Sequence, residues 1–186
     1  EAERELMRAA SRINDTVMER AAAFLQEGIT EREVADYIIS QYAAEGCDAV
    51  AFQPIVSFGA HAADPHHEAD QTRLKAGDCI VIDMGCRKDR YCSDMTRTVA
   101  VGHVTDEMRE VYQTVLCAQK AGIATARAGA TGREVDAAAR AVIDAAGYGE
   151  YFGHSFGHGV GVEIHESPNA SQLNDKPLPE RAVISA

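Results

Sequence analysis

The stretch VIDMGCRKDRYCSDMTRT, residues 81–98, places an aspartate on each of two segments that read as β-strands. Asp83 follows the apolar run CIVI of residues 79–82, and Asp94 stands eleven residues later, before the β-prone MTRTV of residues 95–99. Burying an unpaired carboxylate in a folded protein is costly. Each aspartate therefore either faces solvent or binds a positive charge that lies between them.

The length, charge and composition of the chain limit its possible domain organisation and binding partners. Its 186 residues can bury the core of one domain or of two fused halves. The net charge of −11 argues against binding to nucleic acid or to an anionic membrane surface. No apolar run is long enough to span a bilayer, and the chain does not open with a signal peptide.

The five cysteines indicate reduced thiols and therefore a cytoplasmic protein. They are odd in number and contain no C-x-x-C pair, which argues against a disulfide framework or a zinc knuckle. Cys86 and Cys92 could face each other across a hairpin. We expect them to pack as small apolar residues instead of forming a bridge or binding metal.

Apolar spacing and capping residues predict the elements of the chain. Helices are expected over residues 2–26, 30–46, 106–128 and 131–146. The other segments are an extended run over 51–57, a polar loop over 59–71, the strand with Asp83, a turn over 86–93 and a return strand over 94–101.

An internal repeat relates the two halves. The segment GITEREV of residues 28–34 matches GATGREV of residues 129–135 at five of seven positions, an offset of 101. The same offset carries Gly46 onto Gly147, the glycines expected to end the second helix of each half. Helix-start chemistry that merely occurs twice would not place both terminators at the same distance. We infer duplication of a unit that runs from helices into strands.

The repeat extends to the strand with the first aspartate. Leu74 precedes the turn and strand that carry Asp83, and Leu178 precedes a similar turn and the segment VISA of residues 183–186. Aligning the two leucines, at an offset of 104, carries Asp83 onto position 187. If the halves face each other about a pseudo-twofold axis, four carboxylates converge from two hairpins. Such a set predicts a dinuclear metal site.

Histidines supply further candidate ligands. The segment FGHSFGHGVGVEIHE of residues 152–166 holds His154, His158 and His165 among glycines that let backbone approach a ligand. His66 and His67 lie in the loop ahead of the Asp83 strand. Neutral imidazole can bind metal, transfer protons or contact a substrate carbonyl. We interpret His61 and His103 as structural or surface residues.

Three motifs together resemble the pita-bread metallopeptidases, in the branch of Xaa-Pro aminopeptidases and Xaa-Pro dipeptidases (prolidases). They are VIDMG…SDMTRT of residues 81–98, PHH of residues 65–67 and FGHSFGHGVGVEIHESP of residues 152–168. The resemblance covers essentially the whole chain and implies an α/β (α+β) fold of two pseudo-symmetric halves, with a curved antiparallel sheet and outer helices. Residues 1–186 would form the catalytic domain, incomplete at its C-terminus, with halves of roughly 1–101 and 102–186.

The same resemblance implies a two-metal centre on the sheet. Asp83 would be the bidentate ligand of one metal, Asp94 would bridge both metals, and His158 would bind the second. Two glutamates complete the family's site, and both are expected beyond Ala186. The family histidines that hold substrate and stabilise the tetrahedral intermediate match His66, His154 and His165.

The activity that the resemblance implies is hydrolysis of the peptide bond preceding proline in a small peptide. Two close divalent ions lower the pKa of a bridging water, so that hydroxide is available near neutral pH. Mostly oxygen ligands with a single imidazole suit manganese, with cobalt or zinc as alternatives. The full-length enzyme would be a homodimer, and this chain alone would be inactive because it lacks the two glutamates.

Three other functions fit parts of the pattern. Methionine aminopeptidase shares the fold, although GHSFGHGVGVEIHESP and SDMTRT favour the proline branch. A creatinase-like hydrolase works without metal and would not need Asp83, Asp94 and His158 together. A non-catalytic peptide-binding module would be expected to lose metal ligands, whereas this chain keeps each ligand that it is long enough to contain. Aminopeptidase and dipeptidase activity remain open alternatives.

Overall fold

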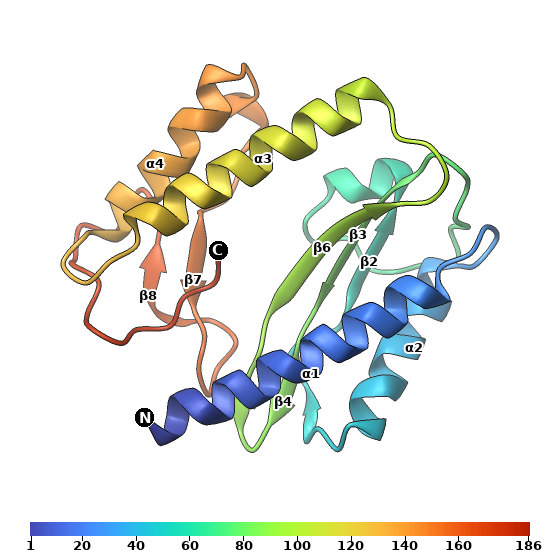
Figure 1. Cartoon of the computed structure of the whole chain (residues 1–186), viewed down its shortest axis with the longest axis horizontal. Helices are drawn as coiled ribbons and strands as arrows, with labels where there is room; N and C mark the ends of the chain where they lie inside the picture. Colours follow the sequence, from blue (N-terminus) through green and yellow to red (C-terminus); the bar gives the residue numbers. More distant parts are fainter. The chain divides into compact units, whose positions relative to one another are not determined.

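The computed structural model describes residues 1–186 and divides the chain into two compact units. The first unit comprises Glu1–Thr105 with Gly161–Ile164, and the second comprises Asp106–Val160 with His165–Ala186. Each unit combines helices with antiparallel strands (Figure 1). The short segment from 161 to 164 belongs to the first unit because the backbone N–H of Cys92 donates a 2.7 Å hydrogen bond to the carbonyl of Gly161.

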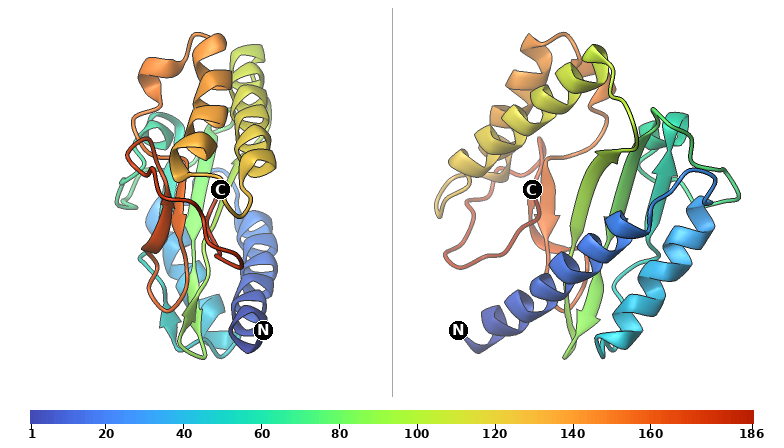
Figure 2. Two further views of the ribbon diagram at one scale, coloured as in Figure 1. Left: turned by 90° about the vertical axis from the view of Figure 1, so that its left-hand side faces the viewer. Right: turned by 45° about the vertical axis from the view of Figure 1, so that its right-hand side comes forward.

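The first unit places helices against an antiparallel sheet (Figure 2). Its helices are α1 (Ala2–Phe24) and α2 (Glu31–Ala44). The main sheet has the order β2 (Ile55–Phe58), β3 (Cys79–Met84) and β6 (Met95–Ala100). A smaller sheet has the order β1 (Ala49–Val50), β4 (Cys86–Lys88) and β5 (Tyr91–Cys92).

Strict alternation along β3 decides which side chains enter the core. Ile80, Ile82 and Met84 are completely buried and join a cluster that includes Val17 of α1 and Ile38 of α2. Burial of each such side chain contributes about 1.5–3 kcal/mol. Because neighbouring residues on a strand point to opposite faces, Asp83 lies on the face away from this core.

The second unit is built from two packed helices and a two-stranded sheet. The helices are α3 (Asp106–Thr125) and α4 (Gly132–Ala145), and the strands are β7 (Gly157–Gly159) and β8 (Glu166–Ala170). Gly122 of α3 lies against the ring of Phe156, and a Cβ at this glycine would approach the ring to 2.2 Å. Only glycine therefore allows this close packing.

The repeat in the sequence appears as the same helix start in both units. Thr30 caps α2 and Thr131 caps α4, and each accepts a 3.1 Å hydrogen bond from the backbone N–H three residues on. The side chains of Glu33 and Glu134 accept from the backbone N–H of the capping threonines at 2.8 and 2.7 Å. Both predicted capping boxes are thus confirmed.

The backbone hydrogen bond just before each capping box is also repeated. The backbone N–H of Gly28 donates to Leu74 at 2.8 Å, and that of Gly129 donates to Leu178 at 3.0 Å. Both glycines have positive φ values, 87° and 88°, a conformation that side chains disfavour. The two leucines used to align the halves therefore occupy equivalent places.

The structure refines several predictions. All four predicted helices are present, and the first ends at Phe24 because Leu25 adopts an extended conformation. The loop over 59–71 begins with the 3₁₀ helix η1 (Gly59–Ala63), and the 3₁₀ helix η2 (Gly149–Tyr151) follows α4. The turn over 86–93 is a short hairpin of β4 and β5 that also pairs with β1. None of the helices has the length and apolar character needed to cross a membrane.

Cys86 and Cys92 are both buried and unbridged, as expected for packing residues. The Cys86 thiol lies 3.7 Å from the carbonyl oxygen of Ala10, and the Cys92 thiol lies 3.4 Å from that of Val162. Each sulfur therefore has its own backbone acceptor and fills space in the first unit.

Candidate metal centre

Asp83 is held at the middle of the main sheet. It lies directly opposite Ile55 of β2 and Thr96 of β6. The hydroxyl of Thr96 donates a 2.8 Å hydrogen bond to Asp83 Oδ1. Since directly paired residues in an antiparallel ladder project to the same face, this bond fixes the carboxylate on the face away from the helices.

Asp94 stands just before β6, two positions from Thr96. Asp94 lies outside the ladder, and continuing the alternation of β6 by one residue predicts that its side chain shares the face of Thr96 and Asp83. The hairpin is unusually tight at this point, because a Cβ on Gly85 would approach the carbonyl oxygen of Ser93 to 2.1 Å. The two aspartates therefore lie on neighbouring segments whose backbones run antiparallel and close together.

The donor chemistry of this face fits a divalent cation. Asp83 and Asp94 are both half-buried, so water only partly solvates the two carboxylates. Carboxylate oxygens suit hard or borderline ions such as Mg²⁺ and Mn²⁺, and a nearby cation offsets the cost of placing two negative charges close together. Asp83 thus lies outside the core, and the alternation of β6 predicts the same face for Asp94.

His158 lies on β7 in the second unit, with its ring oriented by the backbone. Its Nδ1 is 3.0 Å from the carbonyl oxygen of Gly159, which can only accept a hydrogen bond. Nδ1 therefore carries the proton, and the lone pair belongs to Nε2. This arrangement is common in metal-binding histidines, because the second hydrogen bond fixes the tautomer. The ring of His165 packs edge-on against that of His158, with centroids 4.2 Å apart.

The segment that precedes β7 is anchored by a buried ion pair. Asp136 of α4 is completely buried, and Arg140 donates to it through Nε at 2.8 Å. The same guanidinium donates to the backbone carbonyls of Phe152 and His154, each at 2.9 Å. The His154 ring itself is exposed and lies edge-on to Phe152, with centroids 4.8 Å apart. This ion pair could not be singled out from the sequence, since its residues resemble any i, i+4 pair on a helix.

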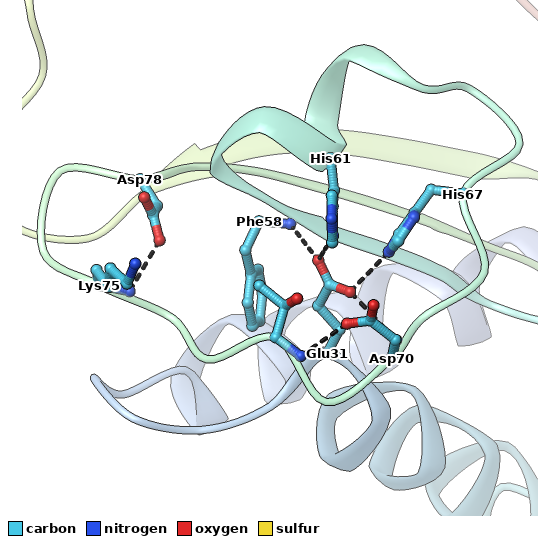
Figure 3. A network of polar contacts seen from close by, with 8 residues as sticks. Glu31, Phe58, His61, His67, Asp70, Lys75 and Asp78 are labelled. Carbon is cyan, nitrogen blue, oxygen red and sulfur yellow. Dashed lines mark hydrogen bonds and ion pairs between the residues drawn. The ribbon is translucent and has the colours of Figure 1, made fainter.

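His66 is exposed in the loop that joins β2 to β3. Its backbone N–H donates a 2.9 Å hydrogen bond to the side chain of Asp64, which stabilises the turn. The neighbouring His67 points toward Glu31 at the start of α2 (Figure 3). Of the two adjacent histidines, only His67 is thus tied to the interior of the unit.

Glu31, His61, His67 and Asp70 form a second group of candidate ligands in the first unit, here called the Glu31 cluster. One ligand atom from each residue lies within 4.8 Å of those of the other three. Glu31 is completely buried, and the two histidine rings both approach its carboxylate (Figure 3).

The sequence did not reveal the Glu31 cluster. His61 was interpreted as a structural or surface residue, and it is half-buried against Glu31. Glu31 occupies the first turn of a helix, where acidic residues are common for electrostatic reasons alone. The signal that could have revealed it is the repeat itself, because position 132 in the second copy is a glycine.

The chain was compared with known protein families and proteins. The model of metallopeptidase family M24 matches residues 5–186. The Xaa-Pro dipeptidase of Pyrococcus furiosus is 42% identical over 181 residues, which are 97% of this chain and 52% of that protein. An uncharacterised peptidase of Bacillus subtilis, YqhT, is 41% identical over 180 residues, 97% of this chain and 51% of that protein.

Solved structures agree with these matches. The X-Pro aminopeptidase from Thermotoga maritima superposes with a TM-score of 0.96 at 42% identity, covering 98% of this chain and 52% of that one. The prolidase from Pyrococcus furiosus gives a TM-score of 0.97 at 41% identity, covering 99% and 55%. The predicted fold class is confirmed. The chain spans about half the length of the relatives it matches.

Proposed function

This chain belongs to metallopeptidase family M24, and on that premise we propose that it is the catalytic part of an enzyme that hydrolyses the peptide bond preceding proline. The observation that carries this proposal is the half-buried Asp83 carboxylate, which Thr96 holds by a hydrogen bond outside the core, with the half-buried Asp94 just before the paired strand β6. The similarity to proteins named Xaa-Pro dipeptidase and X-Pro aminopeptidase supports the substrate class.

Two divalent ions are the proposed cofactors, manganese first and cobalt or zinc as alternatives. Asp83, Asp94 and His158 are the proposed ligands from this chain, together with two glutamates expected beyond Ala186. When bound, such ions supply an activated water near neutral pH and polarise a carbonyl group. Mostly oxygen donors with one imidazole favour manganese over the softer metals.

The chain's own residues account for the remaining steps. The carbonyl of Gly159 accepts a hydrogen bond from Nδ1 of His158, so Nε2 is the ring nitrogen that can bind a metal when the ring is neutral. His66, His154 and His165 are proposed to contact the peptide and to donate to the oxygen of its scissile carbonyl as charge develops there. His66 and His154 are exposed, which leaves both rings accessible to a small peptide.

The proposed enzyme keeps the two-part organisation of the chain. Residues 1–186 would supply both pseudo-symmetric halves of the catalytic domain, roughly 1–101 and 102–186. We place the enzyme in the cytoplasm, because its five cysteines are free thiols and two of them are fully buried. A homodimer is the proposed assembly of the full-length protein.

The test is a peptidase assay on protein that contains this chain together with the two expected glutamates. With Mn²⁺ it should cleave Xaa-Pro dipeptides or Xaa-Pro-Yaa tripeptides and leave Met-Ala peptides intact, and the preferred length decides between dipeptidase and aminopeptidase. Asp94→Asn should lower kcat by roughly a thousandfold or more, because both water activation and metal spacing fail. The 186-residue chain alone should be inactive.

Asp89→Asn is the matched control for the aspartate variant. Asp89 lies in the exposed turn of the neighbouring hairpin and has a positive φ of 49°, which asparagine tolerates well. It should keep wild-type turnover. Wild-type turnover and metal content in the Asp94 variant would instead make Asp94 a structural residue and overturn the proposal.

A further inference from the structure

The Glu31 carboxylate is a buried negative charge whose neighbours are histidines. Oε1 accepts from the backbone N–H of Phe58 at 2.7 Å and lies 3.0 Å from His61 Nδ1. Oε2 lies 2.7 Å from His67 Nε2 and accepts from the backbone N–H of Asp70 at 3.2 Å. The ion-pair partners of Glu31 are these two imidazoles, neither of which carries a permanent charge. A completely buried carboxylate ordinarily requires a full positive charge beside it.

The second half of the molecule shows that helix capping does not require this glutamate. The position that matches Glu31 is Gly132, which opens α4 after Thr131. The second unit forms the same capping box and the same backbone bond from Gly129 to Leu178. A Cβ at Gly132 would approach the carbonyl oxygen of Asn169 to 2.3 Å. The buried carboxylate is therefore specific to the first half.

The other three residues of the Glu31 cluster complete a set of donors that converge on one point. His61 comes from η1, and His67 and Asp70 come from the loop that follows it (Figure 3). The His61 and His67 rings pack together with centroids 4.1 Å apart. Their side chains are 35% and 13% exposed, so the cluster is reachable from solvent on the histidine side.

We propose that the Glu31 cluster is a mononuclear site for a transition-metal ion of the zinc class, separate from the Asp83 and Asp94 site. Two imidazoles with carboxylates are a ligand set that Zn²⁺ accepts, whereas Ca²⁺ and Mg²⁺ prefer oxygen alone. Tetrahedral ligands at zinc distances lie about 3.3 Å apart. The observed 2.7 and 3.0 Å contacts between Glu31 and the imidazoles therefore expand by less than about 1 Å.

Binding of an ion at such a site changes which ring nitrogen of each histidine carries the proton. Without an ion, His61 and His67 each direct an N–H toward the Glu31 carboxylate. When an ion binds, each neutral imidazole carries its proton on the other ring nitrogen, and the freed lone pair ligates the ion. No oxidant is needed, any additional imidazole proton is released to solvent, and the ion brings positive charge to the buried Glu31 carboxylate in place of two hydrogen bonds.

The Glu31 cluster lies away from the proposed peptidase centre. The β2–β3 register pairs Phe58 with Ile80 and Ile55 with Asp83. Phe58, which donates to Glu31, is thus three residues along the strand from the pair that contains Asp83, about 10 Å. An ion at the Glu31 cluster does not depend on the proposed peptidase activity, and the two can be tested separately.

Calorimetric titration with Zn²⁺ tests the site in a background variant that lacks the proposed peptidase metal centre. This background carries Asp83→Asn, Asp94→Asn and His158→Ala. This background should bind one Zn²⁺ per chain. Adding His61→Ala or His67→Ala should weaken binding by at least about tenfold. The control His103→Ala removes an exposed histidine outside the cluster and should bind like the background. Equal affinity in all three histidine variants would overturn the proposal.

Crystals of the unmodified protein soaked in Zn²⁺ provide a second measurement, which does not depend on the folding of any variant. Anomalous difference density measured at the zinc edge should show a peak between Glu31 and the two imidazoles. Zinc density elsewhere with none at the Glu31 cluster would show that these residues form only a hydrogen-bonded network, and the proposal would be wrong.

Discussion

Thr96 donates a hydrogen bond through its hydroxyl to Asp83 Oδ1 at 2.8 Å, across the ladder where β6 and β3 pair the two residues directly. The bond restricts the rotation of a carboxylate that the chain places outside its core. It also occupies one lone pair of Oδ1, so Asp83 meets a cation with a fixed orientation. A neighbour of this kind usually strengthens metal binding without touching the metal.

Replacing Thr96 with valine should therefore weaken Mn²⁺ binding at the proposed centre by about tenfold while the fold is retained. Valine keeps the shape and β propensity of threonine and loses only the hydroxyl donor. The matched control is Thr98→Val, because Thr98 lies opposite Val81 in the same ladder. Calorimetric titration of protein that contains the expected glutamates would measure the effect. Equal Mn²⁺ affinity in the two variants would show that Thr96 does not contribute to metal binding.

The ion pair of Asp136 and Arg140 should contribute strongly to the stability of the second unit. Arg140→Met leaves the completely buried Asp136 without its charged partner and frees two backbone carbonyls. The free energy of unfolding should fall by about 3–5 kcal/mol. Arg133→Met breaks the exposed pair with Asp175 and should cost no more than about 1 kcal/mol. Urea unfolding followed by circular dichroism measures both, and equal losses would contradict the expected role of burial.

The two capping boxes should make the protein less stable in acid. The backbone N–H of Thr30 and its hydroxyl hold the pKa of Glu33 below its ordinary value of 4.5, and Thr131 does the same for Glu134. A carboxyl whose pKa is lowered by folding stabilises the protein above its unfolded pKa, and this stabilisation is lost as the pH falls through the folded value.

The loss should therefore begin near pH 4.5 and continue below it. In the double variant Glu33→Gln with Glu134→Gln, the melting temperature should depend less on pH in this window. Melting curves between pH 3 and 7, roughly the range over which carboxyl groups titrate, would measure the difference. An unchanged slope of melting temperature against pH would show that the two glutamates do not titrate with folding.

The five cysteines should react with thiol reagents at different rates. Burial raises the pKa of the Cys47 thiol to about 12, so at pH 8 roughly one molecule in ten thousand carries the thiolate. Burial also raises the pKa of Cys79 and of Cys86. Cys117 is the exposed cysteine, on α3. Reaction of native protein with a disulfide reagent should label Cys117 first, and Cys117→Ser should abolish the fast phase. Rapid labelling of Cys47 would show that the first unit opens readily.

The helices of this chain and their ends could be predicted from its sequence without knowledge of the tertiary structure. Capping boxes, terminal glycines and apolar periodicity predicted four helices, because these features act within a few residues. The repeat predicted that Gly28 and Gly129 would be equivalent, and both have the same backbone conformation. The apolar run before Asp83 predicted the strand but left open whether its carboxylate faces solvent or binds a positive charge, and the burial pattern of β3 then placed Asp83 outside the core.

Only the tertiary structure decided which distant residues meet. Thr96 becomes the partner of Asp83 through the register of β3 and β6, which the sequence of either strand does not specify. His61, His67 and Asp70 reach Glu31 because a loop folds back over the start of α2. His61, interpreted from the sequence as a structural or surface residue, thereby becomes the neighbour of a buried charge. Local sequence signals have a range of a few residues, whereas the ligands of a site are gathered by packing that spans tens of residues.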